Sequence, residues 1–85
     1  MKMEVRIRKI FRSDSRMKAL LSITLDEKIA IHDIKIIQGE SSVFIAMPSR
    51  KTKEGDYKDI AHPINSDTRT ELSDIILKAY HEQIG

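Results

Sequence analysis

Residues 17–25 read MKALLSITL, with apolar side chains at every second position from Met17 to Leu25. A period of two is typical of a strand that buries one face. Residues 5–12 show the same alternation, with a mostly apolar set against a mostly basic set that includes Arg6, Arg8 and Arg12. The polar residues 12–16 between the two segments predict a turn, so we expect an antiparallel hairpin.

Further strands are predicted downstream of this hairpin. A third strand begins at Ile29, and its apolar phase shifts by Ile34, which predicts a bulge near His32. The continuous apolar run of residues 43–47 indicates a strand covered on both faces, either central in the sheet or at a subunit interface. Residues 57–60 are expected to pair back antiparallel, after a loop whose turn at Gly55 requires a positive φ.

One amphipathic helix is predicted near the C-terminus, where the apolar period changes to about 3.6 residues. Its apolar stripe consists of Leu72, Ile75, Ile76, Ala79 and Tyr80. The helix should start between Ser66 and Thr68, and either of these residues can serve as its cap. We therefore predict one α+β domain over residues 1–85, with a mainly antiparallel sheet of about five strands and one C-terminal helix.

Composition excludes several classes of protein. The chain of 85 residues has a formal net charge of +2 and no cysteine, which rules out disulfides and cysteine-based metal sites. No apolar run approaches the roughly 20 residues that cross a bilayer, and the N-terminus alternates charged with apolar residues, unlike a signal peptide. We expect a soluble cytoplasmic protein. Because so short a chain buries a modest core, dimerisation is expected as well.

Catalytic and metal sites are not predicted. His32 and Asp33 are adjacent, but neighbouring strand residues point to opposite faces, and no nucleophile accompanies them or the pair Asp59 and His62. The three histidines lie too far apart in sequence for a local chelate, and no glycine-rich phosphate loop is present. We expect no enzyme activity, cofactor, metal or small-molecule substrate. His62 is expected to hydrogen-bond a backbone group at the entry to the helix.

A cationic loop between residues 50 and 58 is the candidate binding site. Its side chains can bind phosphates, and an aromatic ring beside them can stack on bases. The candidate contacts are Arg50, Lys51, Lys53, Lys58 and Tyr57, with Arg69 in the first helical turn as a secondary one. The basic face of residues 5–12 is a second candidate surface, or else protects an edge strand from aggregation. A merely solvated loop is the plain alternative, and Glu54 and Asp56 weaken its positive field.

The chain resembles the stage V sporulation protein G (SpoVG) family. The resemblance rests on VRIRKI at residues 5–10 and on AMPSR at 46–50 combined with DIAHPI at 59–64. It implies a homodimer that binds DNA, and in some members RNA, in controlling gene expression, septation and sporulation, without enzyme activity. Carried over to this sequence, it implies that Arg50, Lys51 and Lys53 contact nucleic acid, with Arg69 at the helix start as a secondary contact. The alternative hypothesis is a protein-interaction module that acts through a sheet edge or the helix surface.

Overall fold

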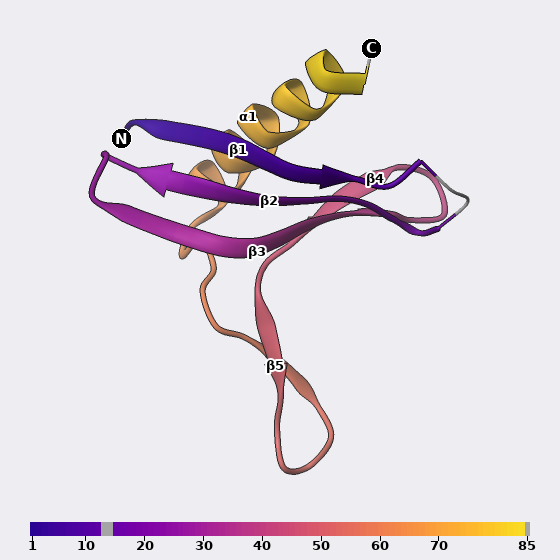
Figure 1. The fold of residues 1–85 in the computed structure, drawn as a ribbon. Helices are drawn as coiled ribbons and strands as arrows, with labels where there is room; N and C mark the ends of the chain where they lie inside the picture. Colours follow the sequence, from indigo (N-terminus) through magenta and orange to yellow (C-terminus); the bar gives the residue numbers. More distant parts are fainter. Residues whose placement is uncertain (13–14, 85) are drawn as a thin grey trace.

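The computed structural model describes residues 1–12 and 15–84 and has an α+β fold, as predicted. Its elements in chain order are β1 (Met3–Ile10), β2 (Met17–Leu25), β3 (Ile29–Gln38), β4 (Val43–Ala46), β5 (Ser49–Lys51), β6 (Tyr57–Asp59) and α1 (Ser66–Ile84). Strands β1 to β4 form one sheet, β5 and β6 form a separate pair that projects from it, and α1 lies behind the sheet (Figure 1).

The four-stranded sheet is antiparallel throughout, with strand order β1-β2-β3-β4. The predicted hairpin of the first two strands is confirmed, because Val5 pairs with Ile23 and Met3 with Leu25. The predicted bulge is also confirmed: Leu21 pairs with Ile34 but Ile23 pairs with Ile31, which leaves His32 and Asp33 together opposite Ser22. Asp33 adopts a φ of 63°, a left-handed conformation that the extra residue of a bulge can require.

Strand β4 lies at an edge of the sheet, so the expectation of a central strand was wrong. It pairs with β3 through Ile36–Ile45 and its neighbours, and Phe44 is 47% exposed. The chain leaves the sheet at Pro48, which has no backbone N–H to continue a ladder, and no later strand within the described residues covers the β4 edge. A position of β4 at a subunit interface stays a prediction.

Residues 49–59, called the ribbon below, form the projecting pair of strands. Residues 57–59 do pair antiparallel as expected, but with β5 and not with the sheet, through Ser49–Asp59, Arg50–Lys58 and Lys51–Tyr57. At the tip, the Thr52 N–H donates to the Asp56 carbonyl oxygen at 2.6 Å and the Gly55 N–H to the Thr52 carbonyl oxygen at 3.0 Å. Gly55 has the predicted positive φ, at 93°.

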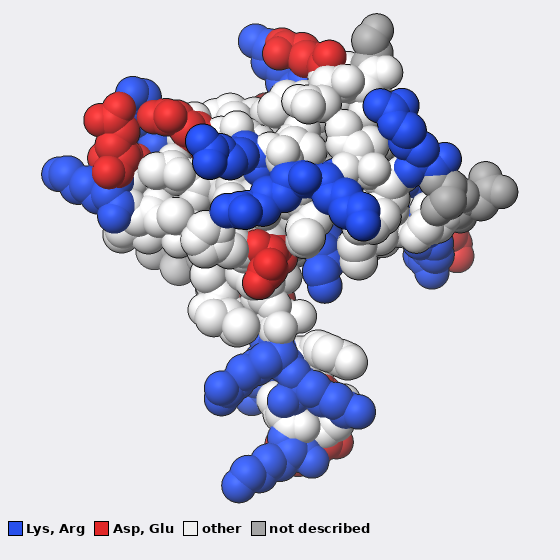
Figure 2. Space-filling view, viewed as in Figure 1, with Lys and Arg blue, Asp and Glu red and all other residues white. Residues whose placement is uncertain are grey.

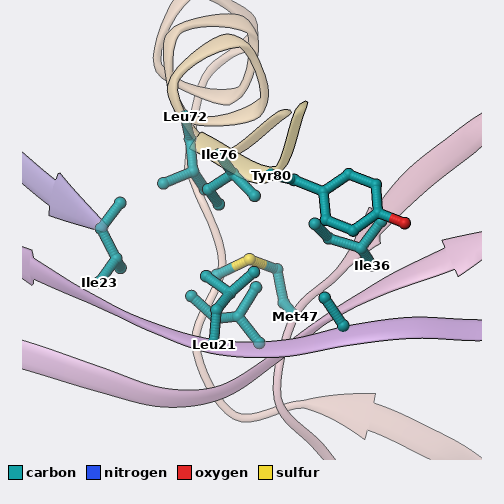
Figure 3. Packing of buried hydrophobic residues seen from close by; sticks show 9 residues of the cluster. Leu21, Ile23, Ile36, Met47, Leu72, Ile76 and Tyr80 are labelled. Carbon is teal, nitrogen blue, oxygen red and sulfur yellow. The ribbon is translucent and has the colours of Figure 1, made fainter. Parts of the chain in front are cut away.

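The core lies between α1 and one face of the sheet. Leu72, Ile76 and Tyr80 of the predicted helical stripe are buried, whereas Ile75 and Ala79 are half-buried. Figure 3 shows the three buried helical side chains facing Leu21, Ile23, Ile36 and Met47. Burying one such aliphatic side chain contributes about 1.5–3 kcal/mol, so this contact stabilises the fold and holds the sheet that carries the ribbon. The opposite face of the sheet is called the open face below.

Helix α1 begins at Ser66, within the predicted range, but its cap is neither Ser66 nor Thr68. The Asn65 side chain caps it, because the Thr68 N–H donates to Asn65 Oδ1 at 2.8 Å. The expected backbone contact of His62 is confirmed, with Nδ1 lying 3.0 Å from the Pro63 carbonyl oxygen. In the described part of the chain, no helix combines the length and apolar character that crossing a membrane requires.

Candidate nucleic-acid interface

The ribbon brings five of the six predicted contact residues together on one small element. Arg50 lies directly across from Lys58, and because strand neighbours alternate, this pair shares one face of the ribbon. Lys51 lies across from Tyr57 on the other face. Lys53 belongs to the turn at the tip. A ligand that wraps the ribbon can therefore meet positive charge on both faces and at the end.

Every residue of β5 and β6 is exposed, and Tyr57 keeps 71% of its surface open to solvent. The ribbon therefore contributes no strand side chain to the core. An isolated two-stranded hairpin is marginally stable at best, and two like charges directly opposite each other destabilise it further. Arg50 and Lys58 are such a pair, so folding alone gives no reason for their placement.

The cations of the ribbon are not neutralised by ion pairs within residues 1–12 and 15–84. The ion pairs found there both involve Lys2, whose Nζ lies 2.7 Å from Glu27 Oε1 and 3.3 Å from Glu4 Oε1. The hydrogen bonds to Glu27 and Glu4 raise the pKa of Lys2. Figure 2 shows lysine and arginine side chains dominating the visible surface of the ribbon, with acidic atoms mostly behind them.

A shallow hollow runs along the Arg50 and Lys58 face of the ribbon. It measures about 480 Å³, and its walls include Thr52, Asp59 and Ile60 as well as the two cations. A guanidinium and an ammonium side by side can clamp one phosphate or two successive ones, with the arginine donating in bidentate fashion. Asp59, which pairs with Ser49 at the end of the ribbon nearer the sheet, reduces the positive field at that end of the hollow. Arg50 and Lys58 lie one pair nearer the tip.

Arg69 stands apart from the other predicted contacts. It is exposed in the first turn of α1, and its backbone N–H donates to the Asn65 carbonyl oxygen at 3.1 Å. The ribbon extends away from the sheet, and α1 lies on the sheet's far side (Figure 1). Arg69 is therefore outside the ribbon, and a ligand that touches both must extend beyond residues 49–59.

A second polar cluster, on the open face, was not predicted as a unit. Arg8 Nε donates to Ser22 Oγ at 3.1 Å, and Ser22 Oγ lies 2.9 Å from His32 Nδ1. The basic face of β1 and the phase shift at His32 were visible in the sequence, but the register that joins three strands at Ser22 was not. Within the described residues, no three histidine, aspartate or glutamate side chains are grouped as metal ligands.

Comparison with known proteins gives a consistent family match. The sequence profile of the SpoVG family matches residues 1–82. Two relatives, each named "Putative septation protein SpoVG", come from Staphylococcus aureus (strain JH9) and Staphylococcus haemolyticus (strain JCSC1435). Each is 57% identical to this chain over 79 residues, a segment that covers 93% of this chain and 78% of the relative.

Proposed function

Because the chain belongs to the SpoVG family, as its motifs predicted, we propose that it is a bacterial regulatory protein that binds nucleic acid through the ribbon. Its relatives are named septation proteins, and we place this chain in the control of septation, cell division and sporulation. It acts on transcription or on RNA in the cytoplasm, as a binding protein and not as an enzyme.

The ribbon is the single observation that carries this proposal. It projects from the sheet, has no buried strand residue, and sets Arg50 against Lys58 without a carboxylate partner in the described part of the chain. A polyanion would remove the repulsion between these cations, and the counterions released from its backbone would favour binding. The arrangement is costly to the free protein and favourable in a complex.

Duplex DNA and single-stranded RNA would use the ribbon differently. The major groove of B-DNA admits a two-stranded β-ribbon, so the tip can enter it with Arg50 near base edges and Lys51 and Lys53 near phosphates. Single-stranded RNA would instead stack its bases on an aromatic ring such as the exposed Tyr57. DNA is the ligand that the two-stranded shape favours, and RNA is the second.

We further propose that the protein is a homodimer joined at the β4 edge. Edge strands of monomers usually carry charge that blocks further pairing, but residues 43–46, VFIA, carry none. Antiparallel pairing of two β4 strands about a two-fold axis perpendicular to the sheet would leave both open faces on the same side. The ribbon follows β4 directly, so this dimer would bring two ribbons into one assembly.

The same β4 edge supports a second candidate function, a protein-interaction module that adds a strand from another protein. In that case the ribbon cations are incidental. Binding of nucleic acid separates the two hypotheses, because β4 carries no cation that could hold a polyanion.

Fluorescence anisotropy with labelled duplex DNA and single-stranded RNA tests the proposal. Replacing Arg50, Lys51 and Lys53 together by alanine should weaken binding by about 100-fold or more, since each charged hydrogen bond contributes about 1.5–3 kcal/mol. The matched control replaces Arg16, Lys28 and Lys78, which removes one arginine and two lysines from outside the ribbon. Equal losses in the two triple variants would reject the ribbon as the contact site.

A further inference from the structure

The open face carries a polar cluster centred on Ser22, which is buried at 5% exposure. Two irregularities in the sheet flank this residue. The β1 register shifts between Ile7 and Lys9, which makes Arg8 the extra residue, and the β3 register places His32 and Asp33 together opposite Ser22. The β3 bulge lies directly opposite Ser22, whereas the β1 bulge lies beside the neighbouring Leu20 and Leu21. Bulges re-aim side chains and are frequent next to functional sites.

Ser22 holds both neighbours in fixed directions. Its hydroxyl oxygen accepts a hydrogen bond from Arg8 Nε at 3.1 Å, so the hydroxyl proton is available for His32 Nδ1 at 2.9 Å. In that arrangement the imidazole proton of neutral His32 is on Nε2, which then points a donor away from Ser22. The two terminal nitrogens of the Arg8 guanidinium also remain free to donate, since no ion pair or other hydrogen bond engages them within residues 1–12 and 15–84.

The surroundings add positive charge and a concave shape. Arg6 is the direct cross-strand partner of Ser22 and is exposed. A hollow of about 420 Å³ lies over the cluster, with Arg6, Arg8, Thr24 and His32 in its walls. Glu4 also contributes to the wall, and Lys2 Nζ, which lies 3.3 Å from Glu4 Oε1 and 2.7 Å from Glu27 Oε1, offsets part of its negative charge. Figure 2 shows lysine and arginine in a band across the sheet above the ribbon.

From this geometry we infer that the open face contains a phosphate-binding site formed by Arg8, His32 and Arg6, with Ser22 as the positioning residue. The guanidinium fork of Arg8 binds two phosphate oxygens, and His32 Nε2–H donates to the same group. The protection of an edge strand, the other role considered for the β1 cations, does not require a buried hydroxyl that orients one of them. The site is separate from the ribbon and stands or falls independently of it.

The phosphate can belong to a nucleic-acid backbone or to a small phosphorylated molecule. NMR spectra of the histidine side-chain nitrogens report binding at this site, because His32, His62 and His81 each give a pair of nitrogen signals and the latter two residues lie outside the hollow. Comparing probes then distinguishes the two sources. We would titrate the full chain with inorganic phosphate, a mononucleotide and a single-stranded oligonucleotide, at fixed pH and ionic strength. Saturable shifts of His32 alone are expected.

A backbone source predicts that the oligonucleotide saturates His32 at far lower concentration than the mononucleotide, whereas equal affinities indicate a small molecule. Arg8→Gln should weaken the binding affinity that the His32 shifts report by about tenfold or more. Lys78→Gln, on α1, should leave it unchanged. Ser22→Ala, which keeps the size of the buried side chain, should weaken it as well. If His32 of the unsubstituted protein shifts with none of the three probes, the site does not exist.

Discussion

At the scale of single residues, the turn between β2 and β3 is built without glycine. Asp26 and Glu27 adopt φ values of 52° and 59°, and the Lys28 N–H donates to the Leu25 carbonyl oxygen at 3.0 Å. Two successive positive φ values match the central residues of a type I′ turn, which are usually Asn-Gly or Asp-Gly. The side chain of Asp26 offsets the cost of its left-handed backbone, since its Oδ1 accepts a hydrogen bond from the Lys2 backbone N–H at 2.8 Å. The side chain of Glu27 forms only an exposed ion pair with Lys2.

Replacing Glu27 by glycine should therefore raise the free energy of unfolding by about 0.5–1 kcal/mol. Relief of the left-handed conformation outweighs the loss of an exposed ion pair and the greater freedom of glycine in the unfolded chain. Urea denaturation measures the difference, and Lys28→Gly is the control, which should destabilise the protein. A destabilised Glu27→Gly variant would contradict this account of the turn.

Asn65 is the residue on which the start of α1 depends. Asn65→Ala removes the acceptor of the Thr68 N–H and should lower the free energy of unfolding by about 1 kcal/mol. Ser66→Ala, one residue later, should change it by less than about 0.5 kcal/mol. The comparison uses thermal or urea unfolding, and equal effects at the two positions would show that the cap is shared.

At the scale of elements, the alternating pattern of residues 17–25 and the phase shift at His32 were enough to predict the hairpin and the bulge. The helical stripe was equally readable, because Leu72, Ile76 and Tyr80 recur at the helical period. The edge position of β4 and the separation of the ribbon from the sheet could not be predicted from the sequence. An apolar run looks the same whether its second face is covered by the same chain, by a partner or by solvent.

The candidate contacts were predictable because residues 50–58 are close in sequence, so a hairpin necessarily gathers them. The pairing of Arg50 with Lys58 depends on the register, which only the structure provides. The cluster at Ser22 depends on the register of β1 with β2 and on that of β2 with β3. The sequence therefore indicates its residues separately but not their grouping into a site.

The ribbon should show a conflict between stability and binding. Lys58→Glu converts the like-charge pair with Arg50 into an opposite-charge pair, which should stabilise the ribbon locally by about 0.2–1 kcal/mol. Amide hydrogen exchange in β5 and β6 should slow accordingly, while affinity for DNA falls. Lys28→Glu, the control with the same charge change, should alter neither the ribbon amides nor the affinity to that extent. Tighter DNA binding by Lys58→Glu would be incompatible with a phosphate contact at this position.

At the scale of the whole molecule, one helix covers one face of the sheet, and the described residues leave the open face and the β4 edge uncovered (Figure 1). The open face carries the Arg8 cluster, and the edge leads directly into the ribbon. The proposed dimer through β4 would place two open faces on one side and bring two ribbons into one assembly, which would offset the small net charge of each chain.

Light scattering during gel filtration should give twice the mass of the chain at micromolar concentration. Phe44→Lys places a charge on the exposed position of β4 and should shift the protein to the monomer mass without unfolding it, because edge lysines oppose strand pairing. Circular dichroism checks that the fold is retained. A monomer mass for the unsubstituted protein at high micromolar concentration would exclude the dimer.

The salt dependence of DNA binding tests most directly whether the ribbon holds a polyanion. Six phosphates neutralised in duplex DNA would give a slope of about −5 in a plot of log affinity against log salt concentration. Alanine at Arg50, Lys51 and Lys53 should make that slope shallower by about 0.9 for each phosphate that the variant no longer neutralises, whereas the control that replaces Arg16, Lys28 and Lys78 should keep it. An unchanged slope in the ribbon variant would contradict the proposal.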